Sequence, residues 1–303
     1  MKALVTGATG FIGRHLVRSL EKPVVLSRSP ERATRALGSD VRAFAWDTAE
    51  GPPVAESLED VTAVFHLAGE PVAEGRWTTE RRRRIVASRV EGTRHLVEAM
   101  AARETRPDVL VSASAVGYYG SAGDRELDES SPAGDDFLAE VSTVWEREAV
   151  AATELGVRVV VLRIGVVIGR GGGALGKMLP PFKLGLGARL GSGAQWVPWI
   201  HVSDVVGLML FVAARDDVSG PVNATAPHPV TNRELTKTLG AAIGRPTVFA
   251  APELALRIML GGFAGVLLSS QRVMPKVALD RGYEFRYPEI EPALRDAVRP
   301  TAS

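Results

Sequence analysis

The sequence predicts an α/β protein with a doubly wound parallel sheet and a smaller, mostly helical C-terminal lobe. Short apolar runs alternate with longer helical patterns as far as about residue 169, which is typical of parallel strands covered by helices on both faces. A glycine-rich turn joins the first apolar run to the first helical pattern. Beyond residue 169 the chain is first glycine-rich and then mostly helical. We therefore predict a sheet domain of residues 1–169, joined by about 204–225, and a lobe of residues 170–203 and 226–303.

Each expected element rests on a local pattern. The strands are short and apolar, and the sixth is the most strongly β-branched, whereas the helices repeat apolar residues at helical spacing. The expected strands cover residues 3–5, 24–26, 41–46, 63–67, 109–111, 157–164 and 222–223. The expected helices cover residues 11–20, a basic stretch after residue 26, a long segment ending near residue 102, 137–155 and 204–214. Right-handed crossovers should connect the parallel strands.

Composition excludes several classes of function. Lys and Arg number 36 against 35 Asp and Glu, so the chain lacks the basic excess of a nucleic-acid binder. Cysteine is absent and the five histidines are scattered, so we expect no thiol chemistry and no metal site. The longest apolar stretch, residues 258–268, contains three glycines and is shorter than the ~20 residues of a membrane span. We therefore expect a cytoplasmic protein that does not enter membranes and acts on a small molecule.

The glycine-rich turn predicts a dinucleotide site. In this turn Gly7 permits a tight bend, Gly10 lets backbone amides approach a pyrophosphate, and Gly13 lets the helix pack closely on the sheet. The start of the helix offers N–H donors and partial positive charge to a phosphate. The alternative is a turn that only closes the corner between strand and helix. The residues expected at the cofactor are Gly7, Thr9, Gly10, Phe11, Ile12 and Gly13.

The end of the second strand favours NADP(H) over NAD(H). A carboxylate there would bind the ribose 2′-hydroxyl of NAD, but this chain has Arg28 and no acid before Glu31. A guanidinium at that position forms a charge-assisted contact with the 2′-phosphate of NADP. The alternative is a solvated surface arginine. At the fourth strand, the small residues of Leu67-Ala68-Gly69 would let the backbone touch the cofactor.

These motifs together resemble the extended short-chain dehydrogenase/reductase superfamily, in its NAD-dependent epimerase/dehydratase branch. More narrowly, the chain is similar to an atypical subgroup known as "epimerase family protein", which ends in a domain of unknown function. The resemblance spans nearly the whole chain. The superfamily motifs stand at residues 6–13, 67–69, 112–114, 163–169 and 199–204, and those of the subgroup at 114–120, 191–193, 195–196, 271–276 and 283–288.

The resemblance implies a Rossmann fold with bound NADP(H). It implies that Ser27 and Arg28 hold the 2′-phosphate and that Leu67 and Ala68 line the cofactor. The remaining residues that it places at the cofactor are Gly69, Val167 at the nicotinamide half, and Arg84 and Arg89 on the helix that follows the fourth strand.

The chain departs from the family at the catalytic pair. Family members carry Tyr-x-x-x-Lys on the helix after the fifth strand, where lysine and cofactor lower the tyrosine pKa. Here Leu138 and Ser142 occupy those positions, and no Tyr or Lys occurs in residues 136–154. Ser114 still matches the serine that polarises the carbonyl, and Tyr118 is the candidate proton donor. An isolated tyrosine has a pKa of about 10, so Tyr118 needs a partner such as Arg89 or the cofactor charge.

Function is predicted from this combination. We expect an NADP-dependent oxidoreductase acting on a small carbonyl or alcohol, with Ser114 and Tyr118 as catalytic residues. The alternative for Tyr118 is that it only packs the wall of the cleft together with its neighbour Tyr119. Two other functions stay open: a non-catalytic NADP(H)-binding sensor or assembly protein, which the missing pair suggests, and a sugar-nucleotide epimerase or dehydratase, which the family suggests.

Overall fold

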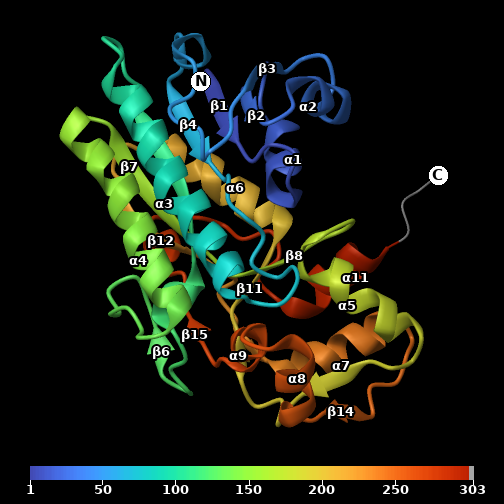
Figure 1. Ribbon diagram of the computed structural model, residues 1–303. Coiled ribbons are helices and arrows are strands. Elements are labelled where there is room, and N and C mark those ends of the chain that lie inside the picture. Colours follow the sequence, from blue (N-terminus) through green and yellow to red (C-terminus); the bar gives the residue numbers. More distant parts are fainter. Residues whose placement is uncertain (300–303) are drawn as a thin grey trace.

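The computed structural model describes residues 1–299, and a seven-stranded parallel sheet forms its centre (Figure 1). The strand order is β12-β7-β5-β4-β1-β2-β3, so the direction of winding reverses between β1 and β4. All neighbouring strands in this sheet are parallel, as the apolar runs predict. The strands are β1 (Ala3–Thr6), β2 (Val24–Ser27), β3 (Arg42–Ala45), β4 (Ala63–His66), β5 (Val109–Ala115), β7 (Arg158–Ile164) and β12 (Gly220–Ala224).

Helices cover both faces of the sheet, because alternate residues of each strand point to opposite faces. Val5 and Phe65 belong to one buried cluster, which includes α1 (Phe11–Val17), α6 (Val202–Ala213) and Ala33 of α2 (Pro30–Leu37). Leu4 and Val64 belong to the other, which includes α3 (Thr79–Ala101) and α4 (Phe137–Val150). Figure 1 shows α3 and α4 side by side over one face, with α6 behind the sheet. The doubly wound class predicted from the sequence is therefore confirmed.

The second half of the chain forms the smaller helical part. A third buried cluster joins α5 (Gly173–Lys183), α7 (Asn232–Ala242) and α11 (Ile290–Val298). Short two-stranded pairings tie these helices to loops of the sheet. The paired strands are β8 (Val166–Ile168) with β11 (Trp199–His201), β9 (Ala188–Leu190) with β14 (Phe249–Ala251), β10 (Trp196–Val197) with β13 (Val230–Thr231), and β6 (Glu126–Leu127) with β15 (Arg272–Val273). The remaining helices are α8 (Glu253–Leu260), α9 (Phe263–Leu268) and α10 (Lys276–Asp280).

Some elements differ from the sequence-based expectation. Helix α1 ends at Val17 rather than at residue 20, and residues 170–198 contain a helix, α5, although glycines dominate that stretch. Helix α5 accommodates Pro180 and Pro181 within its length. Across residues 1–299, every helix is too short or too polar to cross a bilayer.

Candidate functional site

The predicted cofactor residues meet where the winding of the sheet reverses. Thr6 ends β1 beside the end of β4, and its hydroxyl accepts hydrogen bonds from the amides of Leu67 and Ala68, both at 3.0 Å. Parallel strands present their carboxyl ends to one edge, and open α/β sheets bind ligands in the crevice at such a reversal. Thr6 therefore fixes the chain direction of residues 67–69 at the candidate nucleotide site.

The glycine-rich turn packs directly against β4. Gly7 has a positive φ of 65°, and a Cβ there would lie 2.6 Å from the carbonyl oxygen of Leu67. A Cβ at Gly13 would lie 2.3 Å from the carbonyl oxygen of Gly7. Glycine is therefore required at both positions by contact with neighbouring backbone. Thr9 and Gly10 remain exposed on the outer side of the turn.

Phe11 and Ile12 have different surroundings from the glycines. The Phe11 ring packs under a second glycine segment: a Cβ at Gly172 would lie 2.3 Å from it, and one at Gly169 2.9 Å. Ile12 packs against the core of the sheet. The side chains of Phe11 and Ile12 thus support the turn from inside. A ligand would contact the backbone of the turn.

Arg28 lines a cavity of about 280 Å³ at the ends of β2 and β3. The cavity is also lined by Trp46, Asp47 and Glu50. Ser27 stands beside it, and its hydroxyl bonds within the turn, accepting from the amide of Ser29 at 3.2 Å. This edge can hold an adenosine end with a basic group at its rim.

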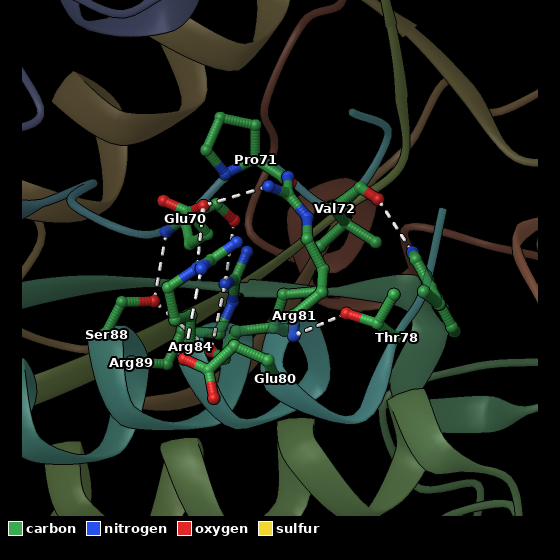
Figure 2. Close-up of polar contacts among 11 residues, drawn as sticks. Glu70, Pro71, Val72, Thr78, Glu80, Arg81, Arg84, Ser88 and Arg89 are labelled. Atoms are coloured by element: carbon green, nitrogen blue, oxygen red, sulfur yellow. Dashed lines mark hydrogen bonds and ion pairs between the residues drawn. The ribbon is translucent and has the colours of Figure 1, made fainter. Parts of the chain in front are cut away.

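Arginines of α3 surround Glu70, which follows β4 (Figure 2). Arg81 donates to the Glu70 carboxylate at 3.1 Å, and Arg84 lies 3.8 Å from it. The Ser88 hydroxyl accepts the amide of Glu70 at 3.0 Å. The Arg84 side chain is exposed, whereas Arg81 is mostly covered. The loop after β4 is thus tied to the first turns of α3, and Arg84 lies between Glu70 and Glu80, 3.9 Å from the latter.

Arg89 is partly buried and is bonded to backbone oxygens. Its guanidinium donates to the carbonyls of Glu70 at 3.0 Å and Ile85 at 3.2 Å, and lies 5.1 Å from the ring centre of Trp145. Burial lowers the pKa of Arg89 to about 10, and the charge of Glu70 partly opposes this. Arg89 adjoins Gly69 at the candidate nucleotide site.

Ser114 is bound to an ion pair that the sequence did not single out. Ser114, the last residue but one of β5, lies directly beside Arg163 of β7, and its hydroxyl donates to the Glu146 carboxylate of α4 at 2.6 Å. Arg163 donates to both oxygens of Glu146, at 2.9 and 2.8 Å. An ionised carboxylate only accepts, so the Ser114 hydrogen is directed to Glu146. A donation from Ser114 to a substrate carbonyl therefore requires its hydroxyl to turn.

The two tyrosines after β5 differ in their bonding. The Tyr119 hydroxyl accepts from Arg163 at 3.0 Å and donates to Asn223 at 2.7 Å, and burial raises its pKa to about 12. Tyr118 is partly exposed, and the guanidinium carbon of Arg163 lies 3.4 Å from its ring centre. The cation against Tyr118 is thus Arg163, whereas the sequence suggested Arg89.

Helix α4 places other residues where the family keeps its catalytic pair. Leu138 packs under Gly117, with 3.1 Å from its Cβ to a Cβ built on that glycine, and Ser142 is buried. Val167 lies in β8, paired with Ile200 of β11, and its carbonyl faces Gly173. Glu146 and Arg163 were not predicted as site residues, although Arg163 begins the family motif at residues 163–169. The available signal was the charge of Arg163 within the apolar run of residues 159–164.

Comparisons with known proteins agree with this architecture. The NAD dependent epimerase/dehydratase family matches residues 3–224, and a domain of unknown function, DUF1731, matches residues 251–297. The chloroplastic epimerase family protein SDR39U1 homolog of Arabidopsis thaliana is 42% identical over 97% of this chain and 86% of its own length.

Two solved structures are also similar. The human epimerase family protein SDR39U1, crystallised with NADPH, is 36% identical with a TM-score of 0.87, covering 98% of this chain and 99% of that one. A nucleoside-diphosphate sugar epimerase from Corynebacterium glutamicum is 30% identical with a TM-score of 0.72, covering 98% of this chain and 58% of that one. The chain therefore belongs to the NAD dependent epimerase/dehydratase family and has its nucleotide-binding fold.

Proposed function

We propose that the protein is an NADP(H)-dependent oxidoreductase that acts on a small carbonyl or alcohol. The observation that supports this most is the Ser114 hydroxyl and the Tyr118 phenol, joined through Glu146 and Arg163 at the ends of β5 and β7. These groups lie at the sheet edge that binds ligands in open α/β folds. They are groups that can bind and protonate a substrate oxygen.

The residues present fit NADP(H). The turn at Gly7 and Gly10 would hold the diphosphate through backbone amides, and residues 67–69 would line the middle of the cofactor. The cavity beside Arg28 supports a 2′-phosphate there. The human relative crystallised with NADPH supports the same choice. When bound, this cofactor would supply or accept the hydride.

The proton would pass through Tyr118. In reduction, Tyr118 gives its phenolic hydrogen to the substrate oxygen as the carbonyl carbon receives the hydride, so an alcohol forms and the tyrosine is left as phenolate. In oxidation, the phenolate takes the hydroxyl proton as the hydride leaves the carbon. The single hydrogen of the reacting hydroxyl is used by Tyr118, so Ser114, whose own hydrogen is directed to Glu146, would accept a hydrogen bond from a second hydroxyl of the substrate.

Cofactor choice is tested by titrating NADPH and NADH against protein fluorescence. A charge-assisted contact to the 2′-phosphate predicts that NADPH binds about ten- to a hundred-fold more tightly. Arg28→Ala should remove most of this preference. Arg35→Ala, which removes an exposed arginine at the end of α2, should leave it unchanged. Equal binding of the two cofactors by the unchanged protein would contradict the assignment of Arg28.

Turnover is tested with NADPH and a panel of small aldehydes and ketones, following cofactor absorbance. Tyr118→Phe should lower kcat/KM for any active substrate at least about 100-fold, the usual contribution of a general acid. Ser114→Ala should also lower it. Turnover that neither change slows would show that other residues carry the reaction. Tight NADPH binding with no turnover in the panel would favour the non-catalytic sensor.

A second candidate is a sugar-nucleotide epimerase, and one observation favours it. A polar cavity of about 320 Å³ opens between the loop after Tyr119 and the C-terminal lobe. Its lining includes Ser121, Ser192 and Gln195, which suit a hydroxylated ligand. Incubation with UDP-hexoses and analysis of the products separates the two: an epimer formed without net cofactor oxidation would support this candidate.

Cytoplasmic location is part of the same proposal. The absence of cysteine supports a reducing compartment. The plant relative is named as chloroplastic, so localisation of a tagged full-length protein is the direct test.

A further inference from the structure

We propose that the Glu146–Arg163 ion pair takes the place of the missing lysine, holding a cation against Tyr118 and fixing Ser114 as a hydrogen-bond acceptor. This inference rests on the proposed function, because it assigns positioning residues to the same site. In the family, the positive charge beside the tyrosine belongs to a lysine on the helix after the fifth strand. Here it would belong to Arg163 of β7, and Glu146 of α4 would hold Arg163 in place.

The guanidinium of Arg163 is fixed on three sides. Its Nε and one terminal nitrogen donate to Glu146, and the other terminal nitrogen donates to Tyr119. Only 4% of Arg163 is exposed. One face of this planar group lies against Tyr118, with the guanidinium carbon 3.4 Å from the ring centre. The cation is therefore held against the tyrosine before any ligand arrives.

Tyr118 and Tyr119 have separate tasks in this arrangement. The hydroxyl of Tyr119 is used twice, by Arg163 and by Asn223, so this residue braces the guanidinium. Among the hydrogen bonds of residues 1–299, none involves the hydroxyl of Tyr118. The phenol of Tyr118 is thus the one that can exchange a proton with a substrate, and a cation in contact with its ring stabilises the phenolate that remains.

Ser114 is positioned by the other half of the pair. With its hydrogen given to Glu146 at 2.6 Å, the serine oxygen has lone pairs for an incoming donor. The reacting hydroxyl has a single hydrogen, which Tyr118 removes or returns, so the donor to Ser114 would be a second hydroxyl of the substrate. The substrate class that fits is a secondary or primary alcohol, with its carbonyl as product.

The other titratable groups near the tyrosines are few among the described residues. Glu129, which follows β6, accepts the amides of Asn223 at 2.9 Å and Val277 at 3.2 Å. Burial raises its pKa, and its charge would oppose ionisation of Tyr119. Glu129 therefore acts on Tyr119, and the test changes only Arg163 and Glu146.

The test is a pH titration of tyrosinate absorbance on the full chain, which needs neither substrate nor cofactor. The chain has four tyrosines. Burial raises the pKa of Tyr119 to about 12 and that of Tyr283 further, which separates both from the early steps. Tyr118→Phe removes one titration step from the absorbance curve, and the step that disappears belongs to Tyr118.

Two variants of the pair have opposite expected signs. Arg163→Met removes the cation and should move the Tyr118 step upward by about 1 to 3 pH units. Glu146→Gln leaves the cation without its counter-charge and should move the step downward. Arg94→Met is the matched control. It breaks the pair between Arg94 of α3 and Glu148 of α4, the helix that also carries Glu146, and should shift nothing. A general loss of structure cannot produce shifts of opposite sign.

The outcomes separate this inference from the proposed function. Opposite shifts in the two pair variants support the ion pair as the source of the charge, whether or not any substrate turns over. An unmoved Tyr118 step, or movement in the same direction in both, overturns it. If Arg163→Met does not fold, the downward shift in Glu146→Gln decides alone. Opposite shifts without turnover of any substrate would support the ion-pair assignment and contradict the proposed oxidoreductase function.

Discussion

Gly7 shows how one glycine, which has no side chain, shapes the candidate nucleotide site. Its positive φ and its contact with the carbonyl of Leu67 bring the turn onto the end of β4. Any Cβ would push the two segments apart. The amides of residues 67 and 68 would then lose their alignment with Thr6, whose hydroxyl accepts both. The position of the turn thus depends on contact as much as on backbone conformation.

We expect Gly7→Ala to lower the unfolding free energy by about 1–3 kcal/mol and to weaken NADPH binding markedly. Gly123→Ala is the matched control: its φ is 62°, close to that of Gly7, but nothing lies within 4 Å of its Cβ position. Urea unfolding and cofactor titration of both variants measure the difference. Equal losses would mean that backbone strain alone, without the contact at β4, accounts for the effect.

At the scale of elements, His66 joins β1, β4 and α3. Because the Thr6 oxygen accepts two amides, its own hydrogen goes to Nδ1 of His66 at 2.8 Å. Nε2 then carries the imidazole hydrogen and donates to Thr93 at 3.0 Å, and Thr93 donates to the carbonyl of Arg89. This chain of bonds requires neutral histidine, and burial lowers the pKa of His66 to about 4.

This bonding predicts a pH dependence of stability. The pKa of His66 in the folded state is below its unfolded value of about 6.5, so the unfolded chain takes up the proton first as pH falls. His66 should therefore cost about 3 kcal/mol of stability between pH 6.5 and 4. In His66→Gln this part of the loss should disappear, as measured by urea unfolding at several pH values.

Burial also lowers the pKa of His201 to about 4, so His201 makes the folded protein less stable over the same pH range. The difference between the variants is therefore more informative than the total loss of stability. His228→Gln changes an exposed histidine and serves as the control. It should keep the acid sensitivity of the unchanged protein. Parallel curves for His66→Gln and the unchanged protein would show that the buried imidazole does not control this dependence.

Local pattern was enough to predict the sheet, because its central strands are buried, mostly apolar runs that only a doubly covered sheet buries. Helix α5 was not expected, since Gly173 and two prolines argue against a helix and only packing in the third cluster stabilises it. The glycine turn is local, so its position was readable. The pairing of Glu146 with Arg163 was not, because it depends on how α4 lies across β5 and β7.

At the scale of the whole molecule, Asp204 fastens the C-terminal segment to the sheet domain. Asp204 lies in the first turn of α6, is 1% exposed, and accepts the amides of Arg286 at 2.7 Å and Tyr287 at 3.0 Å. The Tyr283 hydroxyl donates to its carbonyl at 3.1 Å. The segment matched by the domain of unknown function is thus attached through backbone amides to the helix that packs behind the sheet.

Asp204→Ala would leave two buried amides without acceptors, each costing about 1–3 kcal/mol. We expect a loss of about 2–4 kcal/mol in urea unfolding and faster trypsin cleavage near Arg281 and Arg286 in native buffer. Asp217→Ala is the control, because Asp217 also bridges to this segment, through Arg281 at 2.9 Å, but from the exposed surface. It should change neither measurement, since exposed ion pairs contribute little. If both variants behaved like the unchanged protein, the segment would be held by its apolar contacts, led by Tyr283 and Phe285 against the core.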